Sequence, residues 1–118
     1  MVFYDSHGQP VAYTEDEIHI YLFTGKPVAY IAQDAVYSFG SNHLGWCNDG
    51  WIRDLNGECI FFSEYASGSG PVKPVKSICP VKSVKQVKPV KGVREIKHMR
   101  AINSLSWSPL SGPQFFAR

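Results

Sequence analysis

The chain has 118 residues, with 12 Lys+Arg, 10 Asp+Glu, 44% hydrophobic and 14% aromatic residues. This length fits a single domain, and the charged and aromatic content argues against an intrinsically disordered protein. No run of about 18 apolar residues exists, which excludes a membrane-spanning helix. The first residues contain no basic segment followed by an apolar one, so we expect no secretory signal and a cytoplasmic protein.

The net charge of +2 hides two oppositely charged halves. Residues 1–70 contain two basic and nine acidic residues, a net charge of −7, whereas residues 71–118 contain ten basic residues and one acidic residue, a net charge of +9. The three cysteines, Cys47, Cys59 and Cys79, are expected to be reduced thiols in the cytosol. A zinc site that adds His43 or His98 is the weaker alternative, because the spacings are irregular.

The first half contains four copies of one unit. The copies align on Gly8, Gly25, Ser41 and Gly57, at intervals of 17, 16 and 16 residues. Two copies share the sequence Pro-Val-Ala-Tyr after the anchor, and each unit is predicted to form two short strands around a tight turn. Glycine supplies the positive φ that such turns require; at Ser41 we expect the preceding Gly40 to take this role.

Apolar residues recur three and five positions after each anchor, which places them on one face of a strand. These residues are Val11/Tyr13, Val28/Tyr30, Leu44/Trp46 and Ile60/Phe62. An isolated hairpin is marginally stable in water, so we predict an all-β fold in which four hairpins pack their shared aromatic faces together with pseudo-fourfold symmetry. A single curved sheet is the alternative.

The second half has a period of three. From Pro71 onward, all twelve middle positions of the triplets are aliphatic or Met, and nine of the twelve third positions are Lys or Arg. The predicted organisation is therefore a four-hairpin domain over 1–66, a flexible Gly/Ser joint over 67–70, a basic triplet segment over 71–106 and an aromatic C-terminal segment over 107–118. We expect this last segment to dock on the core, because Trp107, Phe115 and Phe116 are large and apolar.

A period of three indicates an extended, polyproline-II-like backbone, which has three residues per turn. Short strand pieces curling around the hairpins are the alternative. Thirty-six residues at about 3.1 Å each would span about 110 Å, whereas a compact chain of this length has a radius of gyration of about 13 Å. The segment must therefore bend around the hairpins or pair with another chain, and we expect its aliphatic residues to be buried in doing so.

Several segments resemble one bacterial family. They are Tyr-Asp-Ser-His-Gly-Gln-Pro-Val-Ala-Tyr (4–13), Ile-Tyr-Leu-Phe-Thr-Gly-Lys-Pro-Val-Ala-Tyr (20–30), Asp-Gly-Trp-Ile-Arg-Asp (49–54) and the Pro-Val-Lys triplets. Together they resemble the four-fold beta flower proteins over nearly the whole chain. The resemblance implies a fold of four β-petals, and it implies no reaction, substrate or catalytic residue.

The charge division and the aliphatic triplet positions favour a structural or interaction protein that self-associates, with a homo-oligomer as the expected state. In this interpretation the basic residues meet the acidic turns, each exposed ion pair contributing about 0–1 kcal/mol. The alternative is binding of a polyanion, either a nucleic acid or an anionic surface. The candidate residues for it are Lys73, Lys76, Lys82, Lys85, Lys88, Lys91, Arg94, Lys97 and Arg100.

A second alternative is binding of a carbohydrate or another small ligand between hairpins by Trp46 and Trp51. The sequence contains no G-x-S-x-G, H-E-x-x-H or phosphate-binding glycine loop. His7 and His43 lie near the turns of the repeat and are expected to be solvated. We therefore expect no enzymatic activity, no catalytic or metal site and no cofactor.

Overall fold

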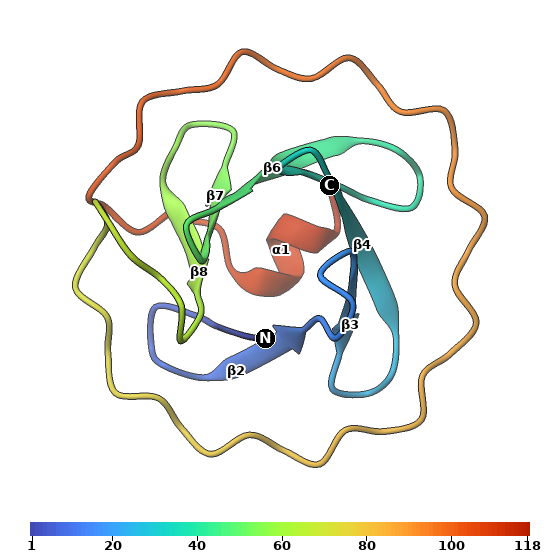
Figure 1. Cartoon of the computed structure of the whole chain (residues 1–118), viewed down its shortest axis with the longest axis horizontal. Helices are drawn as coiled ribbons and strands as arrows, with labels where there is room; N and C mark the ends of the chain where they lie inside the picture. Colours follow the sequence, from blue (N-terminus) through green and yellow to red (C-terminus); the bar gives the residue numbers. More distant parts are fainter.

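A computed structural model describes all residues from 1 to 118 (Figure 1). Eight antiparallel strands form a closed barrel in which each strand pairs with its neighbours in chain order. The strands are β1 (Val2–Tyr4), β2 (Pro10–Tyr13), β3 (His19–Leu22), β4 (Pro27–Ala32), β5 (Ala35–Tyr37), β6 (His43–Asn48), β7 (Trp51–Asp54) and β8 (Cys59–Phe62). The predicted all-β fold of four hairpins is confirmed, and the barrel is closed.

The four hairpins repeat one another in register. The equivalent pairs across them are Phe3↔Ala12, Ile20↔Ala29, Val36↔Gly45 and Ile52↔Phe61. In every hairpin the register shifts directly after the first residue of this pair. Such a bulge bends the strand and increases its twist, so four identical bulges let each hairpin leave the barrel axis at the same angle.

The core lies inside the barrel and is built from these pairs together with Leu44 and Ile60, two of the residues three positions after an anchor. Phe3, Ile20, Val36 and Ile52 are fully buried there, opposite the small residues Ala12 and Ala29. The aromatic residues five positions after each anchor lie in separate clusters between neighbouring hairpins. The predicted face is thus divided: its residues three positions after the anchors contact the core, and its aromatic residues pack between neighbouring hairpins.

Neighbouring hairpins meet at four equivalent junctions. The pairs that face each other there are Tyr13↔Tyr21, Tyr30↔Tyr37, Trp46↔Arg53 and Tyr4↔Phe62. In three of the junctions the two aromatic rings are stacked, with centroids 6.0, 5.7 and 5.4 Å apart. Stacked aromatic pairs therefore hold adjacent hairpins together outside the core.

Residues 71–106, which we call the ring, surround the hairpins (Figure 1). The ring follows the hairpins in chain order and contains no helix or strand. The molecule is a disc of 36 × 36 × 22 Å with a radius of gyration of 13.2 Å. A circle 36 Å across has a perimeter of about 110 Å, which 36 residues fill at about 3.1 Å each. The chain is thus bent into a circle at an extended rise per residue; its polyproline II conformation stays a prediction.

The segments on either side of the ring contact the hairpins. In the Gly/Ser joint, the carbonyl of Ser67 accepts a hydrogen bond from Trp51 Nε1 at 2.9 Å. After the ring, α1 (Gly112–Phe116) lies at the centre of the hairpins (Figure 1). Its Phe115 is fully buried and packs edge-on against Phe61, with ring centroids 6.2 Å apart. No helix of the structure has the length and apolar character needed to cross a membrane.

Candidate functional site

The ring is attached to the turn of each hairpin by a backbone hydrogen bond. These bonds run from the N–H groups of Ser77, Gln86, Glu95 and Ser104 to the carbonyl oxygens of Gly8, Gly25, Ser41 and Gly57, at 2.9, 2.8, 3.0 and 3.0 Å. The four donors are nine residues apart, and all are first positions of triplets. Three triplets of the ring therefore serve each hairpin, and the first position of each triplet faces the hairpins.

All four anchor residues take positive φ, and the three glycines among them must also lack a side chain where the ring passes. A Cβ atom on Gly25, which has φ +92°, would overlap the carbonyl oxygen of Val84, and one on Gly8 would overlap that of Val75. Ser41 itself takes φ +78°, so the expectation that Gly40 supplies the positive φ was wrong. A non-glycine residue in this conformation costs about 1–2 kcal/mol, so the third hairpin fits the ring least well.

The second positions of the triplets point away from the hairpins. We call these twelve side chains the rim; they are Val72, Val75, Ile78, Val81, Val84, Val87, Val90, Val93, Ile96, Met99, Ile102 and Leu105. They are 67–97% exposed. The prediction that bending the segment would bury them was wrong. The inward edge is taken by the first positions, whose backbone bonds need close approach, and this arrangement directs the aliphatic edge outward.

Most of the third positions lie over the aromatic residues of the junctions. Lys82 Nζ lies 4.6 Å from the Tyr13 ring centroid, Lys91 Nζ lies 4.5 Å from that of Tyr30, and the Arg100 guanidinium lies 5.2 Å from that of Trp46. Lys73, Lys76, Lys85 and Arg94 lie 5.5–6.0 Å from rings of Trp51, Tyr4, Tyr13, Tyr21 and Tyr37. Cation–π contacts, rather than ion pairs with acidic turns, are thus the commonest partners of the basic residues.

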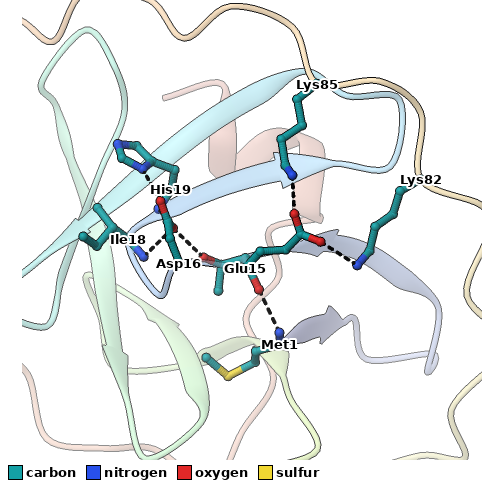
Figure 2. Close-up of polar contacts among 8 residues, drawn as sticks. Met1, Glu15, Asp16, Ile18, His19, Lys82 and Lys85 are labelled. Atoms are coloured by element: carbon teal, nitrogen blue, oxygen red, sulfur yellow. Dashed lines mark hydrogen bonds and ion pairs between the residues drawn. The ribbon is translucent and has the colours of Figure 1, made fainter.

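Glu15 is the one carboxylate that pairs with the ring's lysines. Figure 2 shows it between Lys85 and Lys82, the second pair at 3.3 Å. The hydrogen bonds from Lys85 and Lys82 hold the pKa of Glu15 below its ordinary value. Beside it, Asp16 accepts hydrogen bonds from the backbone of Ile18 and His19 (Figure 2). The expected match of basic residues with acidic turns therefore occurs at the first junction alone.

The junction between β6 and β7 differs from the other three. Trp46 faces Arg53 rather than a second aromatic residue, and the ring residue nine positions after Arg94 is the uncharged Asn103. Arg53 is 3% exposed and donates hydrogen bonds at 2.7 Å to the carbonyls of Gly57 and Ser104. Here Arg53 of the strand takes the place of an aromatic residue, and Arg100 of the ring lies over Trp46.

Two of the nine candidate polyanion-binding residues lie on no aromatic ring. Lys97 donates a hydrogen bond to Gln33 Oε1 at 3.2 Å. Lys88 makes no hydrogen bond, ion pair or aromatic contact; with Lys85 it lines a shallow cavity of about 190 Å³ beside Glu15 and Asp16. The basic residues therefore form a row of separate contacts to the hairpins, interrupted by free Lys88.

The tryptophans that the sequence indicated as ligand-binding residues are both buried. Trp46 is 9% and Trp51 3% exposed. Trp51 packs against Phe62 and Trp107, and Lys73 lies over its ring. Neither indole therefore offers a free face to a ligand, and their role in the structure is to fill the junctions.

Two cavities lie where α1 and the segment before it meet the hairpins. The larger has a volume of about 350 Å³ and is lined by His7, Cys59 and Ser108, among others. Burial raises the pKa of the Cys59 thiol to about 11, so this thiol is protonated at neutral pH. The second cavity, of about 280 Å³, is mostly apolar and is lined by Val28, Phe39 and Phe116, with Lys26 at its edge.

His43 and His98 meet although 55 residues separate them. Their Nδ1 atoms are 3.2 Å apart, and the backbone N–H of His98 donates to His43 Nδ1 at 3.0 Å. His43 is 3% exposed, so the expectation that it is a solvated turn residue was wrong. The signal that could have found this pair is the nine-residue spacing: His98 stands where Pro71, Pro80 and Pro89 stand for the other hairpins.

A comparison with known protein families matches residues 1–116 to the family described as 4-fold beta flower protein. Searches of curated proteins and of solved structures give no match. The match spans the four hairpins, the ring and all of α1. The chain belongs to the family of 4-fold beta flower proteins.

Proposed function

We propose that this protein is an interaction module that associates with further copies of itself through its rim. The observation that carries the proposal is the exposure of all twelve aliphatic side chains of the rim, at 67–97%. Burying one such side chain stabilises a complex by about 1.5–3 kcal/mol, which corresponds to about 60–120 Å² each. Twelve of them offer about 700–1,400 Å², more than the largest apolar patch of about 300–600 Å² on ordinary monomers.

The shape of the rim supports assembly beyond a pair. The ring that carries it surrounds the hairpins completely (Figure 1), so exposed aliphatic side chains lie all around the edge of the disc. Two discs that touch edge to edge would bury about three side chains each, or about 200–400 Å² per partner. A stable pair needs about 800 Å² per partner. Single contacts should therefore be weak, and association should require several neighbours around each disc.

The experiment is sedimentation velocity over a wide range of protein concentrations, with electron microscopy of the concentrated sample. We expect monomers when dilute and flat, edge-to-edge assemblies when concentrated. The variant Val81→Thr, Val84→Thr, Val90→Thr and Val93→Thr keeps the shape of the rim and removes apolar surface, so it should assemble at higher concentration. Tyr65→Ser, at an aromatic residue 67% exposed outside the ring, is the control and should behave as the wild type. Monomers at every concentration, or equal assembly of the rim variant, would contradict the proposal.

Polyanion binding has less support. Eight of the nine candidate cations are engaged with aromatic rings, carboxylates or amide oxygens of the hairpins, so a polyanion would have to compete with these contacts. Lys88 is the exception, and one free cation gives little counterion release.

A further inference from the structure

The third hairpin has a contact to the ring that the other hairpins lack. Where it carries His43, the equivalent residues of the other hairpins are Pro10, Pro27 and Cys59. Where its part of the ring carries His98, the residues at multiples of nine before it are Pro71, Pro80 and Pro89, and the residue nine after it is Trp107, which pairs with Cys59 through the backbone of its neighbours. Proline has no N–H group, so among these positions only His98 donates a backbone hydrogen bond to a side chain of its hairpin, that of His43.

The hydrogen bonds of His43 fix its protonation state. Nε2 lies 2.9 Å from the carbonyl oxygen of Gly45, which can only accept, so Nε2 carries the hydrogen. Nδ1 accepts the hydrogen bond of the His98 backbone N–H at 3.0 Å, so Nδ1 carries none. The backbone bond to the ring therefore requires a neutral imidazole, and a proton on Nδ1 would replace this bond with a contact to His98 Nδ1, 3.2 Å away.

The third hairpin also contains a strained residue and two buried polar atoms without hydrogen-bond partners. Ser41 is a non-glycine residue at φ +78°, and its buried Oγ has no hydrogen-bond partner. Trp46 Nε1, also buried, lacks a partner as well. Each such feature destabilises the closed arrangement of this hairpin. Local opening of the ring should therefore begin here rather than at the other three hairpins.

The surroundings of His43 oppose its protonation on balance. Burial lowers its pKa below the ordinary value, and the positive charges of His98 and Lys97 act in the same direction. The Gly45 carbonyl and the Glu95 carboxylate, which accepts from the backbone N–H of His43, act in the opposite direction. The other groups that line the imidazole are the rings of Tyr37 and Trp46, which carry Arg94 and Arg100 on them.

We propose that His43 and the His98 backbone form a proton-operated latch that opens the ring at the third hairpin. A proton that binds Nδ1 removes the acceptor of the His98 N–H, so the ring segment around residues 92–100 moves off the hairpin. Opening separates Arg100 from Trp46 and displaces the rim side chains of this segment. The pair responds to protons rather than to a metal ion, because no third metal-ligating side chain joins it.

The sign of the pH effect follows from proton linkage. The closed ring holds His43 neutral, whereas in the opened ring His43 is exposed and has the ordinary pKa of about 6.5. The latch therefore contributes its full stabilisation above about pH 6.5 and loses it as the pH falls toward the lowered pKa of the closed state. Between about pH 7.5 and pH 5.5, the population of the open segment should rise by up to about tenfold.

The test is amide hydrogen exchange of the full chain, read by NMR at both pH values and corrected for the intrinsic pH dependence of exchange. In the wild type, the amides of Glu95 and His98 should exchange faster at the lower pH, by up to about tenfold, and the equivalent amides of Gln86 and Ser104 should not change. In His43→Asn, Oδ1 takes the place of Nδ1 and cannot titrate, so the protection should be equal at both pH values. His98→Gln keeps the backbone N–H and should keep the pH dependence, which separates His43 from its neighbour.

Two results would overturn the latch: equal corrected exchange at both pH values in the wild type, or an unchanged pH dependence in His43→Asn. A measurement on the wild type alone covers the case in which the variant does not fold. The nitrogen chemical shifts of His43 should show a hydrogen on Nε2 at neutral pH and a second proton arriving together with the loss of Glu95 and His98 protection. A proton on Nδ1 at neutral pH, or a titration without change in exchange, would also exclude the latch.

Discussion

The hairpins and the ring of this protein are held by different forces. Residues 1–66 bury their apolar side chains in the core and in the aromatic junctions, as in most small β-proteins. The ring has an equally regular apolar pattern, yet its twelve aliphatic side chains face solvent. It is held instead by backbone N–H groups and by Lys and Arg side chains laid over aromatic rings.

The difference shows that periodicity identifies the edges of an extended chain and does not say which edge faces inward. In the ring the choice is made by backbone hydrogen bonds, which need the first positions close to the hairpin turns. The charged groups of lysine and arginine then lie over the aromatic residues. A regular row of hydrophobic residues in a sequence therefore need not be buried. Matched substitutions in the hairpins and in the ring can test this contrast.

The largest expected effect concerns the core. Phe61→Ala removes a fully buried ring that contacts Phe3 and Phe115, and such substitutions cost about 3–5 kcal/mol. Val87→Ala, on the rim, should change the free energy of unfolding by less than about 0.5 kcal/mol. Chemical denaturation of both variants measures the difference. A large loss in Val87→Ala at a concentration where the protein is monomeric would mean that the rim is buried in solution.

The second effect concerns the attachment of the ring. Gly25→Ala places a Cβ against the Val84 carbonyl at φ +92°, and we expect a loss of more than about 2 kcal/mol. Gly68→Ala is the matched control, because Gly68 has φ +74° with no atom within 4 Å of the added Cβ, so it should cost only about 1 kcal/mol. Thermal unfolding and the exchange rate of the Gln86 amide report on the two variants. Equal losses would show that the ring does not press on the hairpin turn.

A smaller effect is expected for the cations of the ring. Lys91→Gln removes the ammonium 4.5 Å from the Tyr30 ring centroid and should cost about 0.5–1 kcal/mol. Lys88→Gln removes the cation that has no partner and should leave stability unchanged. Denaturation of the two variants at low and high salt measures both values. Equal losses of stability in Lys91→Gln and Lys88→Gln would show that the lysines stabilise the protein through its overall charge rather than through contacts with aromatic rings.

The smallest expected effect concerns the reactivity of the thiols in the hairpins and in the ring. Cys47 and Cys59 belong to the hairpins, and burial raises the pKa of each to about 11. Cys79 belongs to the ring and is exposed. A thiol reagent under native conditions near neutral pH should modify Cys79 first and the other two only on unfolding, as mass spectrometry of the modified chain will show. Rapid reaction of Cys59 would mean that the ring and the segment after it leave the hairpin often.

The sequence was sufficient for the part of the fold that is local. The four anchors and the apolar residues after them defined the hairpins, because turn and strand signals lie within a few residues of one another. The inward direction of the ring was not predictable, because it depends on the contact between Gly25 and Val84, residues far apart in the chain. His43 was placed in solvent for the same reason: its partner, His98, reaches it only through the register of the ring.

The register between hairpins and ring also limits how proteins of this shape can change in length. Anchors recur every 16 or 17 residues and ring contacts every nine, and the two halves of each contact are 47 to 69 residues apart in the chain. Duplication of one hairpin would thus add a turn with no stretch of ring to meet it, and the loss of one triplet would shift every later contact. A fifth petal would require two separate insertions at once, so the number of petals is expected to persist while individual sequences diverge.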